Sequence, residues 1–183
     1  MANYQQTFIE AIERTKRLNL KLDVPVLDSQ DTYIKPFHYE DLRDLLCHKF
    51  PEFINGELAL QCATVSYFMK PLVDKYLECE SLITCGYFIL GDATSFFIDE
   101  DFVIKLLKEK QKNRIIGFHV WLTLPSLEII DFTIGQTYAR VGKDIPIHEY
   151  VFKHPNTMQE GSLQFHPVIL GEDFLRKTGY LID

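Results

Sequence analysis

The segment that most constrains the fold is residues 117–133, GFHVWLTLPSLEIIDFT, in which two strand-like runs flank a proline. Aromatic and β-branched residues favour strands, and Pro125 favours a turn between them. We therefore predict a β-hairpin that carries His119 on its first strand and Asp131 on its second. Hydrophobic residues or threonine would serve a purely structural hairpin at these two positions.

The length of the loop at Pro125 decides whether the two polar side chains can meet. Side chains alternate between the two faces of a sheet, so a slip of one residue moves a side chain to the other face. A two-residue turn would pair Leu124 with Leu127. In that register Asp131 points away from His119, whereas a three-residue loop puts both on one face. A joint role for the pair thus predicts an odd loop or a bulge.

The rest of the chain alternates between helical and strand-like patterns. Apolar residues at helical spacing predict helices near residues 4–18, 38–50, 62–77, 99–112 and 171–180. Strands are predicted at 82–90, 144–152 and 163–170. Pro71 lies inside the third helix and should kink or interrupt it. Helices followed by mostly antiparallel strands are typical of the α+β class.

Size and charge limit the kinds of partner. A length of 183 residues suits one well-buried core, so we expect a single domain over 1–183. The net charge of −7 argues against a nucleic acid or an anionic membrane surface as partner, because both attract clustered cations. No run approaches the roughly 18 apolar residues of a membrane span.

Cysteine usage bears on the compartment. Cys47, Cys62, Cys79 and Cys85 form no C-x-x-C pair, and residues 1–8, MANYQQTF, lack a charged-then-apolar signal segment. We therefore expect free thiols in a cytoplasmic protein. Secretion as an effector, by a machine that needs no signal peptide, would leave the same sequence pattern.

One cysteine is placed to act as a nucleophile. Cys62 lies where the loop after Gly56 turns into a helical run, so the N–H groups of the first helical turn would stabilise its thiolate. His119 would exchange the thiol proton, and Asp131 would hold the histidine ring in one tautomer. The residues thus predict a Cys-His-Asp triad with Cys62, His119 and Asp131 as the catalytic residues.

The same residues resemble a known family. Cys62 opens a helix, Gly86-Tyr87 follows in a strand, His119-x-Trp121 comes next, and Asp131-x-Thr133 ends the following strand. This order is similar to the transglutaminase-like branch of the papain-like cysteine protease and acyltransferase fold. The resemblance covers a core of residues 56–135. It leaves an N-terminal helical part, 1–50, and C-terminal strands with a short helix, 136–183, outside the core.

The resemblance implies a nucleophile helix packed on an antiparallel sheet and acyl transfer on an amide bond through a Cys62 thioester. The substrate would be a protein or peptide, and no cofactor or metal is expected. The backbone N–H of Cys62 and the amide of Gln61 would hold the oxyanion, with Trp121 beside the substrate. Peptidase, amidase, glutamine deamidase and transglutaminase all remain open, as do the substrate identity, the oligomeric state and a role as a bacterial effector or toxin domain.

Two other interpretations use the same residues differently. The chain could be a non-catalytic protein-binding module of the same fold with a relict triad, in which Cys62 is a small buried hydrophobe and His119 a hydrogen-bonded core residue. A zinc site would need ligands in close pairs, and the spacing of Cys79 and Cys85 does not supply one.

Overall fold

A computed structural model describes residues 3–28, 32–109, 117–140, 150–154 and 163–181. The helices are α1 (Tyr4–Arg17), α2 (His38–Lys49), the short 3-10 helix η1 (Pro51–Asn55), α3 (Cys62–Leu77), α4 (Glu100–Glu109), α5 (Ile134–Arg140) and α6 (Glu172–Lys177). The strands are β1 (Leu82–Leu90), β2 (Ala93–Ser95), β3 (His119–Thr123), β4 (Ile129–Asp131), β5 (Val151–Lys153) and β6 (Gln164–Leu170). The described chain is therefore α+β, as its sequence predicts.

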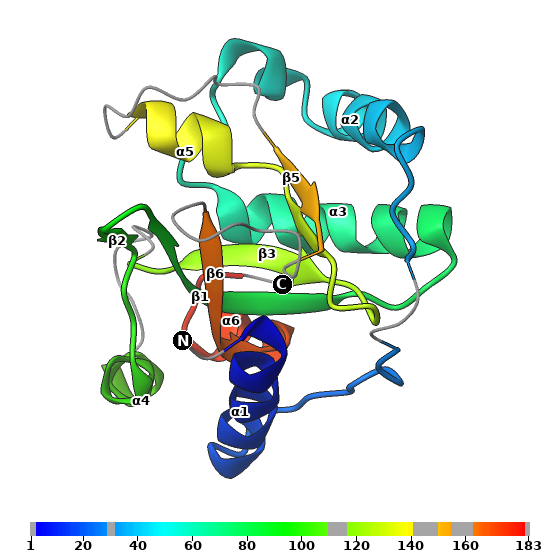
Figure 1. The fold of residues 1–183 in the computed structure, drawn as a ribbon. Coiled ribbons are helices and arrows are strands. Elements are labelled where there is room, and N and C mark those ends of the chain that lie inside the picture. The colour runs from blue at the N-terminus through cyan, green and yellow to red at the C-terminus, as the bar shows by residue number, and fades with distance from the viewer. Residues whose placement is uncertain (1–2, 29–31, 110–116, 141–149, 155–162, 182–183) are drawn as a thin grey trace.

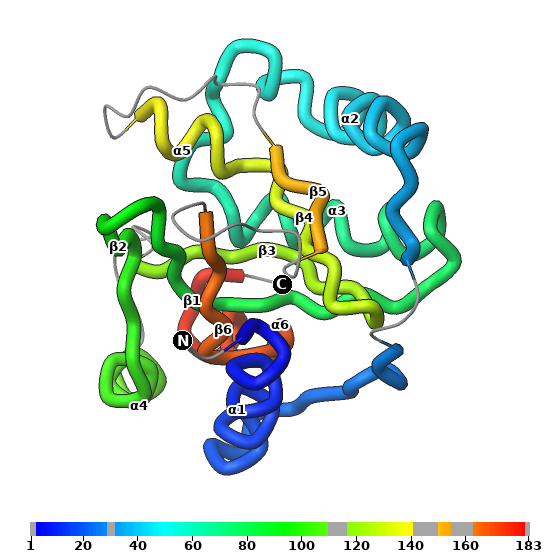
Figure 2. Tube along the Cα trace, viewed as in Figure 1, coloured from blue at the N-terminus to red at the C-terminus, as the bar shows by residue number. Residues whose placement is uncertain are grey.

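Strand β1 is the centre of one curled antiparallel sheet (Figure 1). One edge of β1 pairs with β3 through residues 82–86 and then with β2 through residues 88–90. The other edge pairs with β6, and β4 and β5 continue the sheet beyond β3 (Figure 2). Because β2 and β3 share an edge of β1, the first residue of β3, His119, lies just past the end of β2.

Helices cover both sides of β1 and β3 (Figure 1). Helix α3 lies along one side, where Val65, Met69 and Val73 pack in the larger hydrophobic core. Helix α1 lies on the other side, and its Tyr4 and Phe8 belong to a second hydrophobic cluster. Alternating side chains of the strands supply both cores, because successive residues of a strand face opposite ways.

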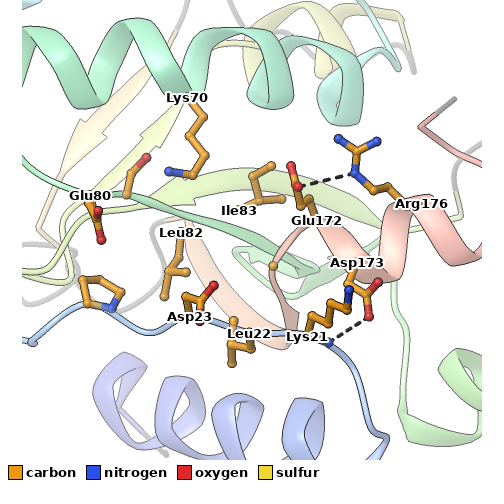
Figure 3. A pocket seen from close by; sticks show the side chains of 13 residues that line it. Lys21, Leu22, Asp23, Lys70, Glu80, Leu82, Ile83, Glu172, Asp173 and Arg176 are labelled. Atoms are coloured by element: carbon orange, nitrogen blue, oxygen red, sulfur yellow. Dashed lines mark hydrogen bonds and ion pairs between the residues drawn. The ribbon is translucent and has the colours of Figure 1, made fainter. Parts of the chain in front are cut away.

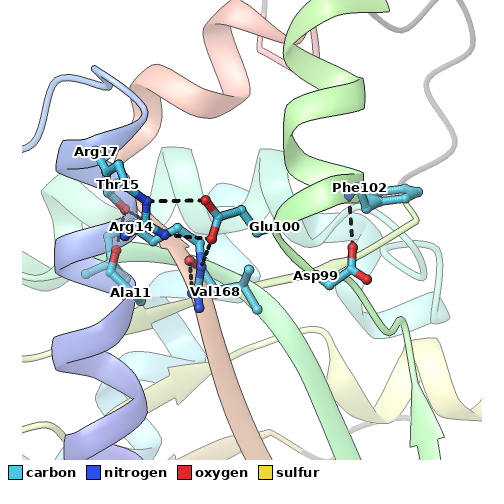
Figure 4. Close-up of polar contacts among 9 residues, drawn as sticks. Ala11, Arg14, Thr15, Arg17, Asp99, Glu100, Phe102 and Val168 are labelled. Carbon is cyan, nitrogen blue, oxygen red and sulfur yellow. Dashed lines mark hydrogen bonds and ion pairs between the residues drawn. The ribbon is translucent and has the colours of Figure 1, made fainter.

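Polar contacts fix α1 against its neighbours (Figure 4). Arg14 donates from Nη1 to the Val168 carbonyl of β6 at 2.9 Å. Arg17 forms an ion pair with Glu100 of α4 at 2.6 Å. The buried hydroxyl of Thr15 accepts from the backbone N–H of Leu170 at 3.0 Å. The N-terminal helix is thereby joined to the last strand of the sheet, outside the core that the family resemblance covers.

Most predicted elements are confirmed. The helices expected at 4–18, 38–50 and 62–77 end within a residue of the observed bounds, and the strand at 82–90 matches. The helix expected at 99–112 is observed over Glu100–Glu109, and the one expected at 171–180 is shorter, Glu172–Lys177. Residues 110–112 and most of the strand expected at 144–152 lie outside the described residues, which place β5 at Val151–Lys153.

One expectation needs correction, and three short elements escaped prediction. Helix α3 continues through Pro71 instead of breaking there. Pro71 is exposed, so water can solvate the carbonyl that loses its backbone partner. Helix α5, η1 and the three-residue β2 were not predicted, because such short segments carry too few residues to show a periodicity.

Gly86 provides a test of this packing. A Cβ atom at Gly86 would lie 2.0 Å from the His166 carbonyl oxygen and 2.8 Å from the Trp121 ring. Because the first neighbour is backbone of β6, we expect Gly86→Ala to reduce the free energy of unfolding by about 3 kcal/mol or more. Gly117→Ala is the matched control, since its Cβ would meet only the tip of Phe102 at 3.2 Å. Equal losses in urea unfolding of the two variants would contradict the packing.

Candidate active site

A three-residue loop joins β3 to β4. Thr123 pairs with Ile129, and the N–H of Leu124 donates to the Glu128 carbonyl at 2.9 Å, which leaves residues 125–127 as the loop. The odd loop that a joint role of the two polar side chains requires is therefore confirmed. Loops of this length commonly end with a residue in the left-handed region, and here that residue is a leucine with a φ of 70°.

The register brings His119 and Asp131 together on one face. His119 Nε2 lies 2.6 Å from Asp131 Oδ2, and each side chain is only 1% exposed. The other carboxylate oxygen, Oδ1, accepts from the backbone N–H of Thr133 at 2.9 Å and from its hydroxyl at 3.1 Å. Both oxygens of Asp131 are thus engaged, and their partners fix the plane of the carboxylate.

Cys62 is the third predicted residue and interacts with the imidazole. It is the first residue of α3 and is buried, with 2% of its surface exposed. The thiol interacts with His119 by charge and by hydrogen bonding. His119 Nδ1 is nonetheless buried without a hydrogen bond of standard geometry to any described residue, so sulfur and ring are near neighbours rather than a well-aligned pair.

The surroundings of His119 favour its protonated form. Burial lowers the pKa of the imidazole, but the charge of Asp131, the charge of Cys62 and hydrogen bonds to both raise it, and the result is a pKa of about 10. These neighbours therefore favour the protonated form of the ring over the neutral one. A protonated imidazole beside a cysteine is the environment that supports a thiolate.

Aromatic rings enclose the His119 imidazole. Phe88 meets it edge-on at 5.0 Å, and Phe96 lies 5.9 Å away, between ring centroids. Trp121 is stacked at 6.1 Å, and Phe165 is tilted at 6.4 Å. The faces of aromatic rings attract a cation, so this enclosure suits an imidazolium as well as excluding water.

The two residues predicted to bind the oxyanion and the substrate make hydrogen bonds within the fold. Gln61 is exposed, and its side-chain amide donates to the Glu57 carbonyl at 2.8 Å. Trp121 is fully buried, and its indole N–H donates to the Tyr4 hydroxyl at 2.9 Å. Gln61 thus stabilises the turn before α3, and the Trp121 ring stacks on the His119 imidazole.

Gln136, which the sequence did not single out, fixes the segment that precedes Cys62. Gln136 of α5 is buried, accepts from the N–H of Leu58 at 2.8 Å and donates to the Phe53 carbonyl at 2.7 Å. It therefore fixes both ends of the segment that leads into α3. Because α5 begins three residues after Asp131, this contact joins the cysteine to the carboxylate strand. A glutamine in IGQTYAR gives no sequence signal for such a role.

A separate cavity of about 630 Å³ lies beside Lys70 of α3 and the start of β1 (Figure 3). Charged side chains of both signs surround it, including Lys70, Glu80 and Asp23, and none of the triad lines it. Glu172 and Arg176 at its rim pair with each other at 3.4 Å. This cavity is therefore separate from the candidate site at Cys62.

Potential metal ligands are dispersed over the described residues. No three His, Cys, Asp or Glu side chains among them gather closely enough to hold a metal ion. In that same part of the chain, no helix has the length and apolar character needed to cross a bilayer.

Comparisons with protein-family models, with curated proteins and with solved structures found no match to this chain. The family resemblance thus depends on the sequence motifs alone. What bears on chemistry is the geometry of Cys62, His119 and Asp131.

The charge on His119 can be measured directly. Burial lowers the pKa of the imidazole, but Asp131 and Cys62 raise it by more, so we expect its ¹⁵N NMR signals to titrate near pH 10. Cys62→Ser should move the midpoint to lower pH, whereas Cys47→Ser, on the distant α2, should leave it unchanged. A midpoint near the ordinary 6.5 in the unmodified protein would contradict the assignment of the ring environment.

The raised pKa of His119 also makes the free energy of unfolding depend on pH. A folded-state pKa above 6.5 stabilises the fold fully below pH 6.5, and this contribution is lost as pH rises toward 10. His119→Gln lacks the titrating ring, so its unfolding free energy should change less than that of the unmodified protein over that range. Urea unfolding at a series of pH values measures the difference.

Proposed function

We propose that the protein catalyses cysteine-dependent acyl transfer on an amide bond of a protein or peptide. The observation that supports this proposal is the buried group of Cys62, His119 and Asp131, in which the His119 ring contacts the Asp131 carboxylate at 2.6 Å and interacts with Cys62. In the same proposal, the nucleophile helix α3 and the sheet form a papain-like, transglutaminase-like arrangement.

The proposed reaction begins with transfer of the Cys62 thiol proton to His119. The Cys62 thiolate attacks the amide carbonyl, and the backbone N–H of Cys62 stabilises the oxyanion. The C–N bond then breaks as His119 donates its proton to the leaving nitrogen, which leaves a thioester on Cys62. His119 next removes a proton from water or an amine, which attacks the thioester, releases the acyl product and restores the thiolate.

Asp131 acts through His119 in this scheme. Its Oδ2 accepts the Nε2 proton at 2.6 Å and so leaves Nδ1 as the nitrogen that exchanges a proton with sulfur. Whether water or an amine accepts the acyl group decides between hydrolysis, deamidation and transamidation. Delivery as an effector is compatible with each outcome.

A second function is favoured by one observation. All three side chains are buried, with Cys62 at 2%, His119 at 0% and Asp131 at 1% exposed. A protein-binding module with a relict triad would keep such a closed arrangement as part of its core. The reactivity of the Cys62 thiol separates the two proposals.

Iodoacetamide labelling at pH 7 with mass mapping tests the nucleophile. Cys47 is half-buried, whereas Cys62 and Cys85 are buried, so exposure alone predicts that Cys47 reacts first. We expect Cys62 to react faster than Cys85 by at least about tenfold, because a neighbouring imidazolium favours the thiolate. Burial raises the pKa of Cys85 well above its usual value, which makes it the matched buried control.

His119→Gln should bring Cys62 down to the rate of Cys85. Cys62→Ala should abolish amine or ammonia release from a peptide mixture while the protein still folds. Slow labelling of Cys62 in the folded, unmodified protein would favour the non-catalytic module.

Asp131→Asn should impair the triad through the tautomer of His119. Thr133 donates two hydrogen bonds to Oδ1, so the asparagine oxygen should stay there and its NH₂ group should face the ring. Nε2 must then accept, which leaves the proton on Nδ1, where it blocks transfer from Cys62. We expect amide turnover to fall by up to about 10⁴, the size of the effect that the same change has in a serine protease triad.

Retention of the normal rate by Asp131→Asn would show that the carboxylate is only a strand-end residue. Circular dichroism of the variant serves as the control for folding, since the substitution keeps the shape of the side chain.

A further inference from the structure

The proposed chemistry requires an entrance that the described structure keeps closed. A carbonyl carbon must approach the nucleophile to about 3–3.5 Å before it can react. Cys62 and His119 are 2% and 0% exposed, so no substrate can reach the space between them in this conformation. Some part of the enclosure has to move, and the question is which part the structure holds least firmly.

Phe96 fills a gap in the sheet beside His119. Strand β2 ends at Ser95, which pairs with Phe88, and β3 begins at His119, which pairs with Gly86. Both strands follow the same edge of β1, so Phe96 stands between the end of one and the start of the other. Its ring centroid lies 5.9 Å from that of His119 and 5.6 Å from that of Phe88.

Phe96 differs from the other rings of the enclosure in how it is held. Phe88, Trp121 and Phe165 are buried and belong to strands β1, β3 and β6 in the interior of the fold. Phe96 is only partly buried and follows the three-residue β2, which pairs with no strand except β1 among the described residues.

The backbone of Phe96 is also unfavourable. Its φ of 59° lies in the left-handed region, which an aromatic residue seldom occupies. Ala93 and Thr94 of β2 and the neighbouring Phe97 are exposed, so an outward turn of the hairpin removes only the partly buried Phe96 ring from the second hydrophobic cluster. This movement would uncover the histidine ring.

We propose that Phe96 is the residue that controls access to the Cys62 thiol and limits the size of the acyl group admitted. At rest its ring closes the space beside His119, and outward rotation of the β2 hairpin opens it. This inference rests on the proposed acyl transfer for its purpose, but the closure itself is a property that can be measured without any turnover.

The test compares two thiol reagents of different size on the folded protein. We expect Phe96→Ala to accelerate labelling of Cys62 by fluorescein-maleimide on the order of tenfold, and labelling by the small iodoacetamide less, because reaction scales with the fraction of open molecules. Phe97→Ala is the matched control, since its exposed side chain is the next in sequence and packs on Tyr87 instead of His119. Phe96→Leu should give an intermediate rate.

Cys85 reports on the fold in the same experiment, because it is 0% exposed and should stay unlabelled in every variant. If Phe96→Ala also exposes Cys85, the variant is unfolded and the comparison is made with Phe96→Leu. Unchanged labelling of Cys62 in a folded Phe96 variant, or an equal increase in Phe97→Ala, overturns the proposal. Faster labelling of Cys62 without any amide turnover would support control of access by Phe96 and argue against acyl transfer.

Discussion

The candidate site depends on one buried ion pair, that of His119 and Asp131. A charged pair in the interior is tolerated only when its geometry is good and its remaining polar atoms are satisfied. Here the 2.6 Å contact supplies the first condition, and the two hydrogen bonds from Thr133 supply the second for the carboxylate. His119 Nδ1 has no hydrogen-bond partner among the described residues, and Cys62 interacts with the same ring. Under the proposed acyl transfer, this nitrogen is the one available to exchange a proton with the thiol.

The contact between His119 and Asp131 could largely be predicted from the sequence, because side chains alternate strictly between the two faces of a sheet. Whether the loop between the strands has an odd or an even number of residues decides whether the two side chains lie on the same face. If His119 and Asp131 act together, the loop at Pro125 must have an odd number of residues. The sequence alone does not show which loop length forms. The position of Cys62 at the start of α3 could also be predicted from the sequence, since a long periodic helix has a clear beginning.

The parts that escaped prediction are short segments and side-chain orientations. Helix α5 and strand β2 are too short to show a period, yet they supply Gln136, which fixes the segment before Cys62, and lead into Phe96 beside His119. Gln61 and Trp121 were placed by motif position, but each amide or indole N–H takes the acceptor that tertiary packing offers, Glu57 and Tyr4 respectively. Which acceptor that is depends on residues far away in the chain.

Burial strengthens the contact between His119 and Asp131 and, at the same time, blocks access to it. Removing water raises the attraction between imidazolium and carboxylate, and the enclosing rings keep that environment intact. Under the proposed acyl transfer, a substrate has to enter without disrupting this pair. The moving part therefore cannot be β4, α5 or the strand that bears the histidine, since each of these fixes a member of the proposed triad. The β2 hairpin fixes none of them. It contributes one ring to the enclosure and no hydrogen bond to the pair, which makes it the part of the described structure that can move at the lowest cost to the chemistry.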